Sequence, residues 1–154
     1  MVLNFLATAL VTCGVGKVPK APGTFGSLLA GIIWWFYSSY IGEVAIIVTF
    51  FVGWLGTHYY EKWNNRHDPK EVVIDEVVGM WMTLYLAPPK LSILLLGFLL
   101  FRLFDIWKPF PIGWVDKKVP GAFGTMFDDV LAGAIAWASL FGAITVTEHY
   151  GILL

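Results

Sequence analysis

Two apolar stretches decide the fold class of this chain: residues 25–41, FGSLLAGIIWWFYSSYI, and residues 44–60, VAIIVTFFVGWLGTHYY. Neither stretch contains Asp, Glu, Lys or Arg, and only Gly42 and Glu43 separate them. A membrane-spanning helix needs about 20 predominantly apolar residues, with a range of roughly 17–25. We therefore predict two spanning helices joined by a minimal turn.

Three further segments continue this pattern, and the first of them is unusual. Residues 91–107 and 130–146 are largely apolar, whereas residues 69–87 contain Asp75 and Glu76 well inside the segment. A chain of 154 residues is long enough for one domain and short for two. We expect a single membrane-embedded domain over residues 1–154. The three segments are residues 69–87, 91–107 and 130–146.

The N-terminal residues 1–16 are apolar but short for a span. They lack the charged first region of a secretory signal peptide, so we do not expect cleavage. We expect an interfacial or re-entrant helix there. Together the segments predict an all-α fold, a polytopic membrane helical bundle with about five spanning helices and this short N-terminal helix.

The composition supports a membrane protein. Hydrophobic residues make up 58% of the chain and charged residues 14%, whereas soluble domains average about 45–50% and 25%. The net charge of −1 creates no field that would attract a nucleic acid. The single cysteine, Cys13, excludes an intramolecular disulfide and a cysteine-only metal site. These values exclude a disordered chain, a charge-driven nucleic-acid binder and an ordinary cytosolic enzyme.

The distribution of lysine and arginine predicts the orientation. If the segment before residue 25 lies in the cytoplasm, eight basic residues fall on that side, Lys90 falls outside and Arg102 lies within a span. The bias favours a multi-pass membrane protein with this side in the cytoplasm. The eight are Lys17, Lys20, Lys62, Arg66, Lys70, Lys108, Lys117 and Lys118.

On this topology, five carboxylates from three predicted helices fall at one depth near the cytoplasmic side. A transporter is expected to hold its ionisable groups nearer the midplane, whereas an enzyme acting on lipid headgroups would hold them here. A carboxylate inside an apolar span costs a few kcal/mol, so adjacent carboxylates need a cation. Hard oxygen ligands without clustered His or Cys suit Mg²⁺ or Mn²⁺, and salt bridges to Arg102 or a lysine are the structural alternative. The five are Asp75, Glu76, Asp105, Asp128 and Asp129.

Helix capping offers a structural explanation for some of the acids. Residues 68–71, DPKE, form a capping-box pattern, which predicts a helix start at Asp68 with Glu71 in the first turn. Thr125 and Asp128 fit a second box. Capping alone could therefore explain Asp128, but it does not explain Asp129.

The pattern P-G-x-F-G-[ST] occurs twice, at residues 22–27 and 120–125, each time before a predicted helix on the cytoplasmic side. Glycine lets the backbone approach a ligand closely, and the free amides of a helix N-terminus suit a phosphate. We predict a phosphate contact from Gly23, Thr24 and Ser27. Simple helix punctuation by a Pro-Gly turn and a hydroxyl cap is the alternative.

Two basic residues flank the third acid. Arg102 and Lys108 lie three positions on either side of Asp105, on one helical face. An ionic cluster within the helix is one interpretation. In the other, Asp105 binds a metal while the two cations bind a phosphate. Carboxylates, a metal and cations are the parts of a phosphoryl-transfer site, and the chain has no Walker loop for ATP. Hydrolysis of a lipid phosphomonoester is the reaction that fits best.

Four ordered motifs over about residues 18–140 resemble those of the bacterial phosphatidylglycerophosphatase A family. The resemblance implies a Mg²⁺-dependent membrane phosphatase that converts phosphatidylglycerophosphate to phosphatidylglycerol at the cytoplasmic face. It also implies catalytic roles for Asp75, Glu76, Asp105 and Asp129, metal ligation by these four and Asp128, and phosphate binding by Arg102 and Lys108. The motifs are APGTFGS (21–27), IDEVVGMW (74–81), FRLFDIWKP (101–109) and GTMFDD (124–129).

Other classes use the same intramembrane acids. An ion or proton transporter would move ions without releasing phosphate, and a non-catalytic membrane subunit would depend on the acids only for folding or assembly. A lipid phosphotransferase would need a second alcohol substrate. Within the phosphatase interpretation, water attacks directly with Asp129 or Glu76 as base, or an Asp forms an aspartyl-phosphate. The sequence leaves these routes, the number of metal ions and the oligomeric state open.

Overall fold

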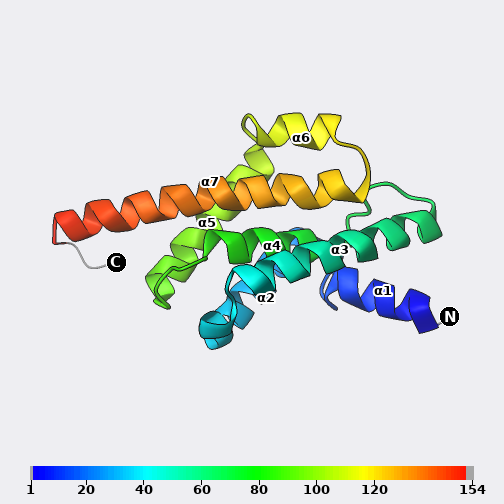
Figure 1. The fold of residues 1–154 in the computed structure, drawn as a ribbon, viewed down its shortest axis with the longest axis horizontal. Helices are drawn as coiled ribbons and strands as arrows, with labels where there is room; N and C mark the ends of the chain where they lie inside the picture. The colour runs from blue at the N-terminus through cyan, green and yellow to red at the C-terminus, as the bar shows by residue number, and fades with distance from the viewer. Residues whose placement is uncertain (1, 152–154) are drawn as a thin grey trace.

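Every regular element in the computed structural model, which describes residues 2–151, is helical. This confirms the all-α prediction. In chain order the elements are α1 (Val2–Thr12), α2 (Pro22–Tyr37), the 3-10 turn η1 (Ser38–Tyr40), α3 (Glu43–Asn64), α4 (Ile74–Thr83), α5 (Leu91–Trp107), α6 (Ile112–Lys118) and α7 (Gly121–His149). Figure 1 shows the long C-terminal helix running along the bundle, and the four helices α3, α4, α5 and α6 pack against it.

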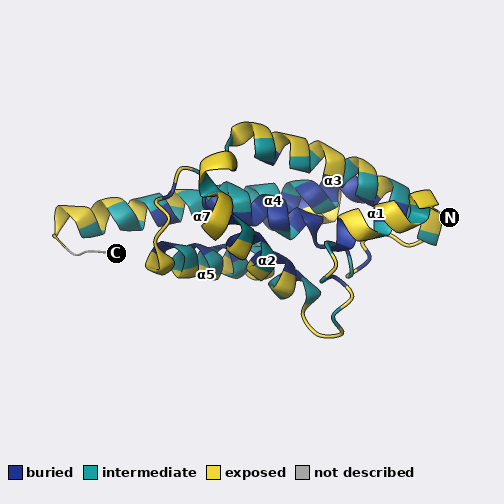
Figure 2. Ribbon diagram, turned by 90° about the horizontal axis from the view of Figure 1, so that it is seen from below, coloured by how far each residue is buried: buried dark blue, intermediate teal, exposed yellow. Residues whose placement is uncertain are grey.

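Helix α4 lies at the centre of the bundle. It packs against α2, α3, α5 and α7, and Figure 2 shows it as the most continuously buried helix. Its apolar residues face these neighbours on several sides, with Val78 and Met80 fully buried. A helix that is apolar all round is expected to be buried in this way. The two acids at its start, Asp75 and Glu76, are therefore carried into the interior.

The crossing of α4 and α7 is close because glycines meet there. A Cβ atom on Gly133 would lie 2.4 Å from the Gly79 carbonyl oxygen, and one on Gly79 would lie 2.8 Å from the Asp129 carbonyl oxygen. The Thr83 hydroxyl donates a hydrogen bond to the Gly79 carbonyl at 2.9 Å. Small residues at a helix crossing let the backbones approach. This crossing brings the acid pair of α7 next to that of α4.

The predicted third span, residues 69–87, does not form a full-length spanning helix. Helix α4 has 10 residues, and at a rise of 1.5 Å per residue it covers about 15 Å, half of the roughly 30 Å hydrocarbon core. Of the helices in the described part of the chain, α7 is the one that is long and apolar enough to cross a membrane by length and composition. Helix α2, with 16 residues, lies just below the spanning range of roughly 17–25 residues, and α5, with 17, lies at its lower limit.

The predicted helix start at Asp68 is wrong. The chain between α3 and α4 forms a loop, in which Asp68 has a φ of 47°. Its backbone N–H donates to the Glu61 carboxylate at 2.9 Å, and the Glu71 carboxylate accepts a hydrogen bond from Arg66 at 2.8 Å. The Val73 N–H donates to a carbonyl of α1 at 2.8 Å. Contacts with α1 and α3 therefore override the local capping pattern and delay the helix to Ile74.

Both copies of the repeated pattern open a helix, as predicted, and all of their residues except Pro120 lie within it. Helix α2 begins at Pro22 and α7 at Gly121. The Ser27 hydroxyl donates back to the α2 backbone at 2.8 Å, so it caps nothing. Thr125 lies in the second turn of α7. The predicted capping box between Thr125 and Asp128 is therefore wrong, and capping does not explain Asp128.

The predicted N-terminal helix is present as α1. It packs against α3 through a face that includes Ala7 and Val11, which are buried. Its other face exposes large apolar side chains, among them Leu3 and Phe5. With 11 residues it rises about 16 Å, too little to span a bilayer. Its interfacial or re-entrant placement stays a prediction.

Candidate active site

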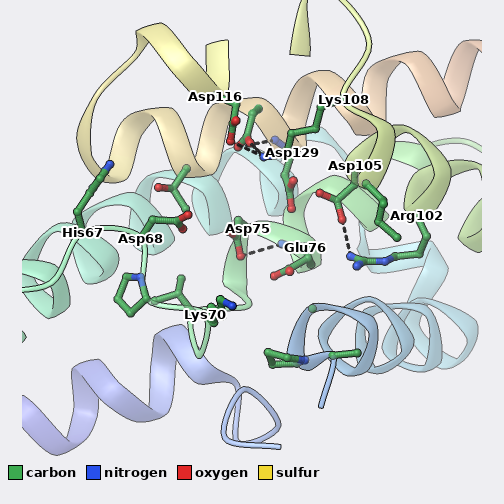
Figure 3. A pocket seen from close by; sticks show the side chains of 18 of the residues that line it. His67, Asp68, Lys70, Asp75, Glu76, Arg102, Asp105, Lys108, Asp116 and Asp129 are labelled. Atoms are coloured by element: carbon green, nitrogen blue, oxygen red, sulfur yellow. Dashed lines mark hydrogen bonds and ion pairs between the residues drawn. The ribbon is translucent and has the colours of Figure 1, made fainter. Parts of the chain in front are cut away.

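A cavity of about 330 Å³ opens where the starts of α2, α4 and α7 meet the end of α5 (Figure 3). Seven acidic side chains line it, together with three side chains of Lys and Arg, so acidic residues outnumber basic ones by four. All five acids predicted from the sequence reach the cavity, as do Gly23, Arg102 and Lys108. The lining carboxylates are Asp68, Asp75, Glu76, Asp105, Asp116, Asp128 and Asp129.

Three of these carboxylates face one another without a cation. One oxygen from each of Asp75, Glu76 and Asp129 lies within 4.8 Å of the other two. Across the described residues, no ion pair reaches any of the three. The Glu76 Oε2 atom is buried and has no hydrogen-bond partner. Because buried charges must be paired or bind a metal, this orphaned oxygen among hard ligands fits a Mg²⁺ or Mn²⁺ ion.

The other two predicted metal ligands have cation partners instead. The Asp105 carboxylate pairs with Arg102 at 2.5 Å, and the Asp128 carboxylate pairs with Lys108 at 2.6 Å. Figure 3 shows Asp105 reaching Arg102 at one side of the cavity. The five predicted ligands thus fall into two groups. Asp105 and Asp128 each have one carboxylate oxygen paired with a side-chain cation, whereas the other three acids have no such partner within the described residues.

Asp116, on the short helix α6, is a site residue that the sequence analysis missed. Its carboxylate lies 2.5 Å from Lys108 Nζ, opposite Asp128. Burial lowers the pKa of the Lys108 ammonium, but its hydrogen bonds with Asp116 and Asp128 outweigh this and raise that pKa above its ordinary value. Lys108 is therefore a fixed positive charge. The sequence signal was weak: Asp116 lies four residues after Ile112, on the same side of a helix, but nothing in the local pattern links it to Lys108.

Arg102 reaches from α5 to the start of α2. Its Nη1 atom lies 3.4 Å from the Ser27 hydroxyl oxygen, and its Nε atom is buried without a hydrogen-bond partner. A Cβ atom on Gly23 would lie 2.0 Å from Glu76 Oε1 and 3.3 Å from Arg102 Nη1. The missing side chain of Gly23 therefore makes room for Glu76. The first copy of the repeated pattern shapes the site through this contact.

Two predicted phosphate contacts are not brought to the cavity. Thr24 and Ser27 do not line it. The Thr24 backbone N–H already donates to the Ala21 carbonyl at 3.0 Å, and Ser27 is fully buried against Arg102. Ser27 thus contributes by holding a cation. Residues 120–125 supply Thr125 to the lining.

The model of the family described as phosphatidylglycerophosphatase A matches residues 8–144 of the chain. The chain belongs to the phosphatidylglycerophosphatase A family. The match includes every acid of the site and all of α2 to α6. Members of this family are phosphatases, so this chain is an enzyme of that class.

Curated relatives agree with the family assignment. The phosphatidylglycerophosphatase A of Escherichia coli (strain K12) is 36% identical over 133 residues, covering 83% of this chain and 77% of the relative. That of Haemophilus influenzae is 39% identical over 145 residues, covering 90% and 88%. A relative from Bacteroides thetaiotaomicron, provisionally named a phosphatidylinositol-3-phosphatase, is 38% identical over 136 residues, covering 80% and 84%. No solved structure matches the chain.

Proposed function

We propose that this enzyme hydrolyses the terminal phosphomonoester of phosphatidylglycerophosphate, in a Mg²⁺-dependent reaction at the cytoplasmic face of the bacterial inner membrane. The observation that carries the proposal is a group of three carboxylates, those of Asp75, Glu76 and Asp129. They converge close to Arg102 and Lys108, but these two cations are paired with other acids, Asp105 and Asp128. Two relatives bear the name of this activity. The products are phosphatidylglycerol and inorganic phosphate.

The charge of the cavity supports the metal requirement. A phosphomonoester is a dianion, and acidic side chains in the lining already outnumber basic ones by four. Two unit charges of like sign 4 Å apart repel by about 4 kcal/mol at an effective dielectric constant of 20. A divalent ion held by Asp75, Glu76 and Asp129 would weaken this repulsion. When bound, such an ion supplies Lewis-acid stabilisation of phosphoryl oxygens and lowers the pKa of water.

The two cations of the site have a separate task. In hydrolysis, a water oxygen bonds to phosphorus while the bond from phosphorus to the glycerol oxygen breaks, and that oxygen takes up a proton. Negative charge spreads over the equatorial phosphoryl oxygens in the transition state. Arg102 and Lys108 would stabilise this charge from fixed positions. Asp105 holds Arg102, and Asp128 holds Lys108.

The proton balance assigns a task to the unpaired acids. The attacking water must lose a proton as it bonds to phosphorus. Glu76 or Asp129 would accept it, because neither carboxylate forms an ion pair in the described part of the chain. In this assignment Asp105 and Asp128 are positioning residues.

We place α2, α3, α5 and α7 across the bilayer, with α4 entering it only partway. This modifies the prediction of about five spans to four. Support comes from the outward faces of these helices, which expose large apolar side chains along their length. Soluble monomers rarely expose contiguous apolar patches larger than a few hundred Å². Examples are Ile32 and Phe36 on α2, Val48 and Leu55 on α3, Leu95 and Leu99 on α5, and Val146 on α7.

The test measures phosphate release from phosphatidylglycerophosphate in detergent micelles. Purified wild type, Asp75→Ala and the control Glu148→Ala are assayed with Mg²⁺ and with EDTA. We expect turnover by wild type and Glu148→Ala with Mg²⁺ only, and none by Asp75→Ala. Glu148 lies near the far end of α7, so its loss should not affect the site.

Two outcomes would change the proposal. Release from phosphatidylinositol 3-phosphate but not from phosphatidylglycerophosphate would reassign the substrate to the headgroup named for the Bacteroides relative. If folded wild type releases no phosphate from either lipid with Mg²⁺ or Mn²⁺, the catalytic proposal fails. Ion flux through reconstituted vesicles would then favour a transporter.

A further inference from the structure

Large apolar side chains surround the turn between α5 and α6, directly beside the cavity. Ile106, Trp107, Phe110 and Trp114 are 71%, 68%, 84% and 55% exposed, respectively. We call these four residues the apolar edge. Ile106 also lines the cavity. The apolar edge is therefore continuous, through Ile106, with the lining of the cavity.

The opposite side of the cavity is different in character. The loop between α3 and α4 closes it with polar residues, among them His67, Asp68 and Lys70. The cavity thus has one polar side and one apolar side. A glycerolipid phosphomonoester has the same division, with a charged headgroup at one end and acyl chains at the other.

Helix α6 has the character of a membrane-interface element. It lies on the outside of α7, as Figure 1 shows, and packs against it with Ile112 and Val115 buried. Its outward side exposes Trp114, and its last turn carries Lys117 and Lys118. Aromatic residues combined with lysines are typical of segments at the headgroup level of anionic membranes.

We propose that the apolar edge binds the acyl–glycerol portion of the lipid substrate, so that the lipid reaches the cavity sideways from the bilayer across the α5–α6 turn. This inference rests on the proposed lipid phosphatase function and adds the route and the source of lipid selectivity. The phosphomonoester then lies near Lys108 while the chains remain among the bilayer lipids. A soluble phosphomonoester would gain nothing from this surface.

The experiment compares two substrates that share a headgroup. Long-chain phosphatidylglycerophosphate is presented in mixed micelles, and the dihexanoyl analogue is presented as dissolved monomers. The ratio of kcat/KM for the long-chain substrate to kcat/KM for the short-chain substrate is measured for wild type, for Phe110→Ser with Trp114→Ser, and for Trp63→Ser. Trp63, on α3, is 49% exposed and lies outside the apolar edge. Trp63→Ser therefore makes the same Trp-to-Ser change as Trp114→Ser, but at a different surface.

We expect the double variant to lower this ratio by about tenfold or more, since two aromatic contacts with acyl chains are lost. Trp63→Ser should leave the ratio unchanged. An unchanged ratio in the double variant overturns the inference. An equal fall of the ratio in Trp63→Ser and in the double variant overturns it as well. If the double variant loses all activity, the single variant Phe110→Ser decides, because its exposed side chain contributes little to packing. Wild type that hydrolyses neither substrate would instead refute the proposed function.

Discussion

The acid pair at the start of α4 and the acid pair of α7 have the same local geometry but different surroundings. In each pair the second backbone N–H donates to the first carboxylate at 3.1 Å, from Glu76 to Asp75 and from Asp129 to Asp128. On α7, Lys108 contacts Asp128 at 2.6 Å. Neither acid of the α4 pair has an ion-pair partner within the described residues.

This difference shows that neighbouring helices, not local sequence, divide the acids into two roles. Lys108 follows the last turn of α5 and reaches the α7 pair, while Arg102 of the same helix is held by Asp105 and Ser27. The α4 pair, at the centre of the bundle, and Asp129 of the α7 pair have no ion-pair partner within the described residues, and we propose that these three acids hold the metal ion. The variants below test this division, beginning with the largest expected effect.

Asp75→Asn should have the largest effect. Partners that only orient a metal ligand already contribute 10–100-fold to metal affinity or activity, so losing a ligand should lower kcat/KM by more than about 100-fold. Phosphate release at rising Mg²⁺ concentrations would measure the fall in kcat/KM, and calorimetric titration of the purified protein would measure the fall in Mg²⁺ affinity. An Asp75→Asn protein that binds Mg²⁺ as tightly as wild type would remove the distinction between the two acid pairs.

Gly23→Ala should lower activity about 100-fold while the fold persists, because a shift of about 1 Å in a catalytic group can have this effect. The new Cβ atom would displace the flexible end of Glu76. The matched control is Gly124→Ala in the second copy of the repeated pattern. Its Cβ atom would lie 2.0 Å from the Val119 carbonyl oxygen, so backbone must move. Activity assays with thermal unfolding should show lost activity alone for Gly23→Ala and a lowered Tm for Gly124→Ala. The opposite pattern would contradict the assignment of Gly23 to the site.

Asp128→Asn should lower activity by 10–100-fold while Mg²⁺ binding is retained, because Asp128 orients Lys108 and such partners have effects of this size. The same calorimetric titration, run beside Asp75→Asn, separates the two roles. Loss of Mg²⁺ binding equal to that in Asp75→Asn would make Asp128 a metal ligand, as the sequence alone predicted.

Asp116→Asn should have the smallest effect, at most about fivefold. Its ion pair with Lys108 is partly exposed, and exposed pairs contribute only about 0–1 kcal/mol. Lys108 also keeps its contact with Asp128. Steady-state kinetics should show the change mainly in KM, since a less firmly held cation binds phosphate less well. A loss as large as that of Asp128→Asn would show that α6 is essential to the position of Lys108.

The sequence by itself determined the helical class, the family and five of the seven acids that line the cavity. Long apolar stretches in the chain predict helices, since a helix satisfies its own backbone hydrogen bonds. The four motifs contain every acid that the sequence analysis assigned to the site. Asp75 and Glu76 could be recognised as acids that need a cation because they interrupt an apolar segment, and capping left Asp129 unexplained. The structure places Asp75 and Glu76 in the first turn of α4, and not well inside a helix as the sequence predicted.

Only the tertiary structure decided which acids are free for a metal, where α4 begins, and that Asp116 takes part. The Asp128 partner comes from the end of α5, and the start of α4 depends on hydrogen bonds to α1 and α3. Such contacts join residues far apart in the chain. Capping patterns and helical spacing describe neighbours within a turn or two, so they contain no information on which distant cation will reach a given carboxylate.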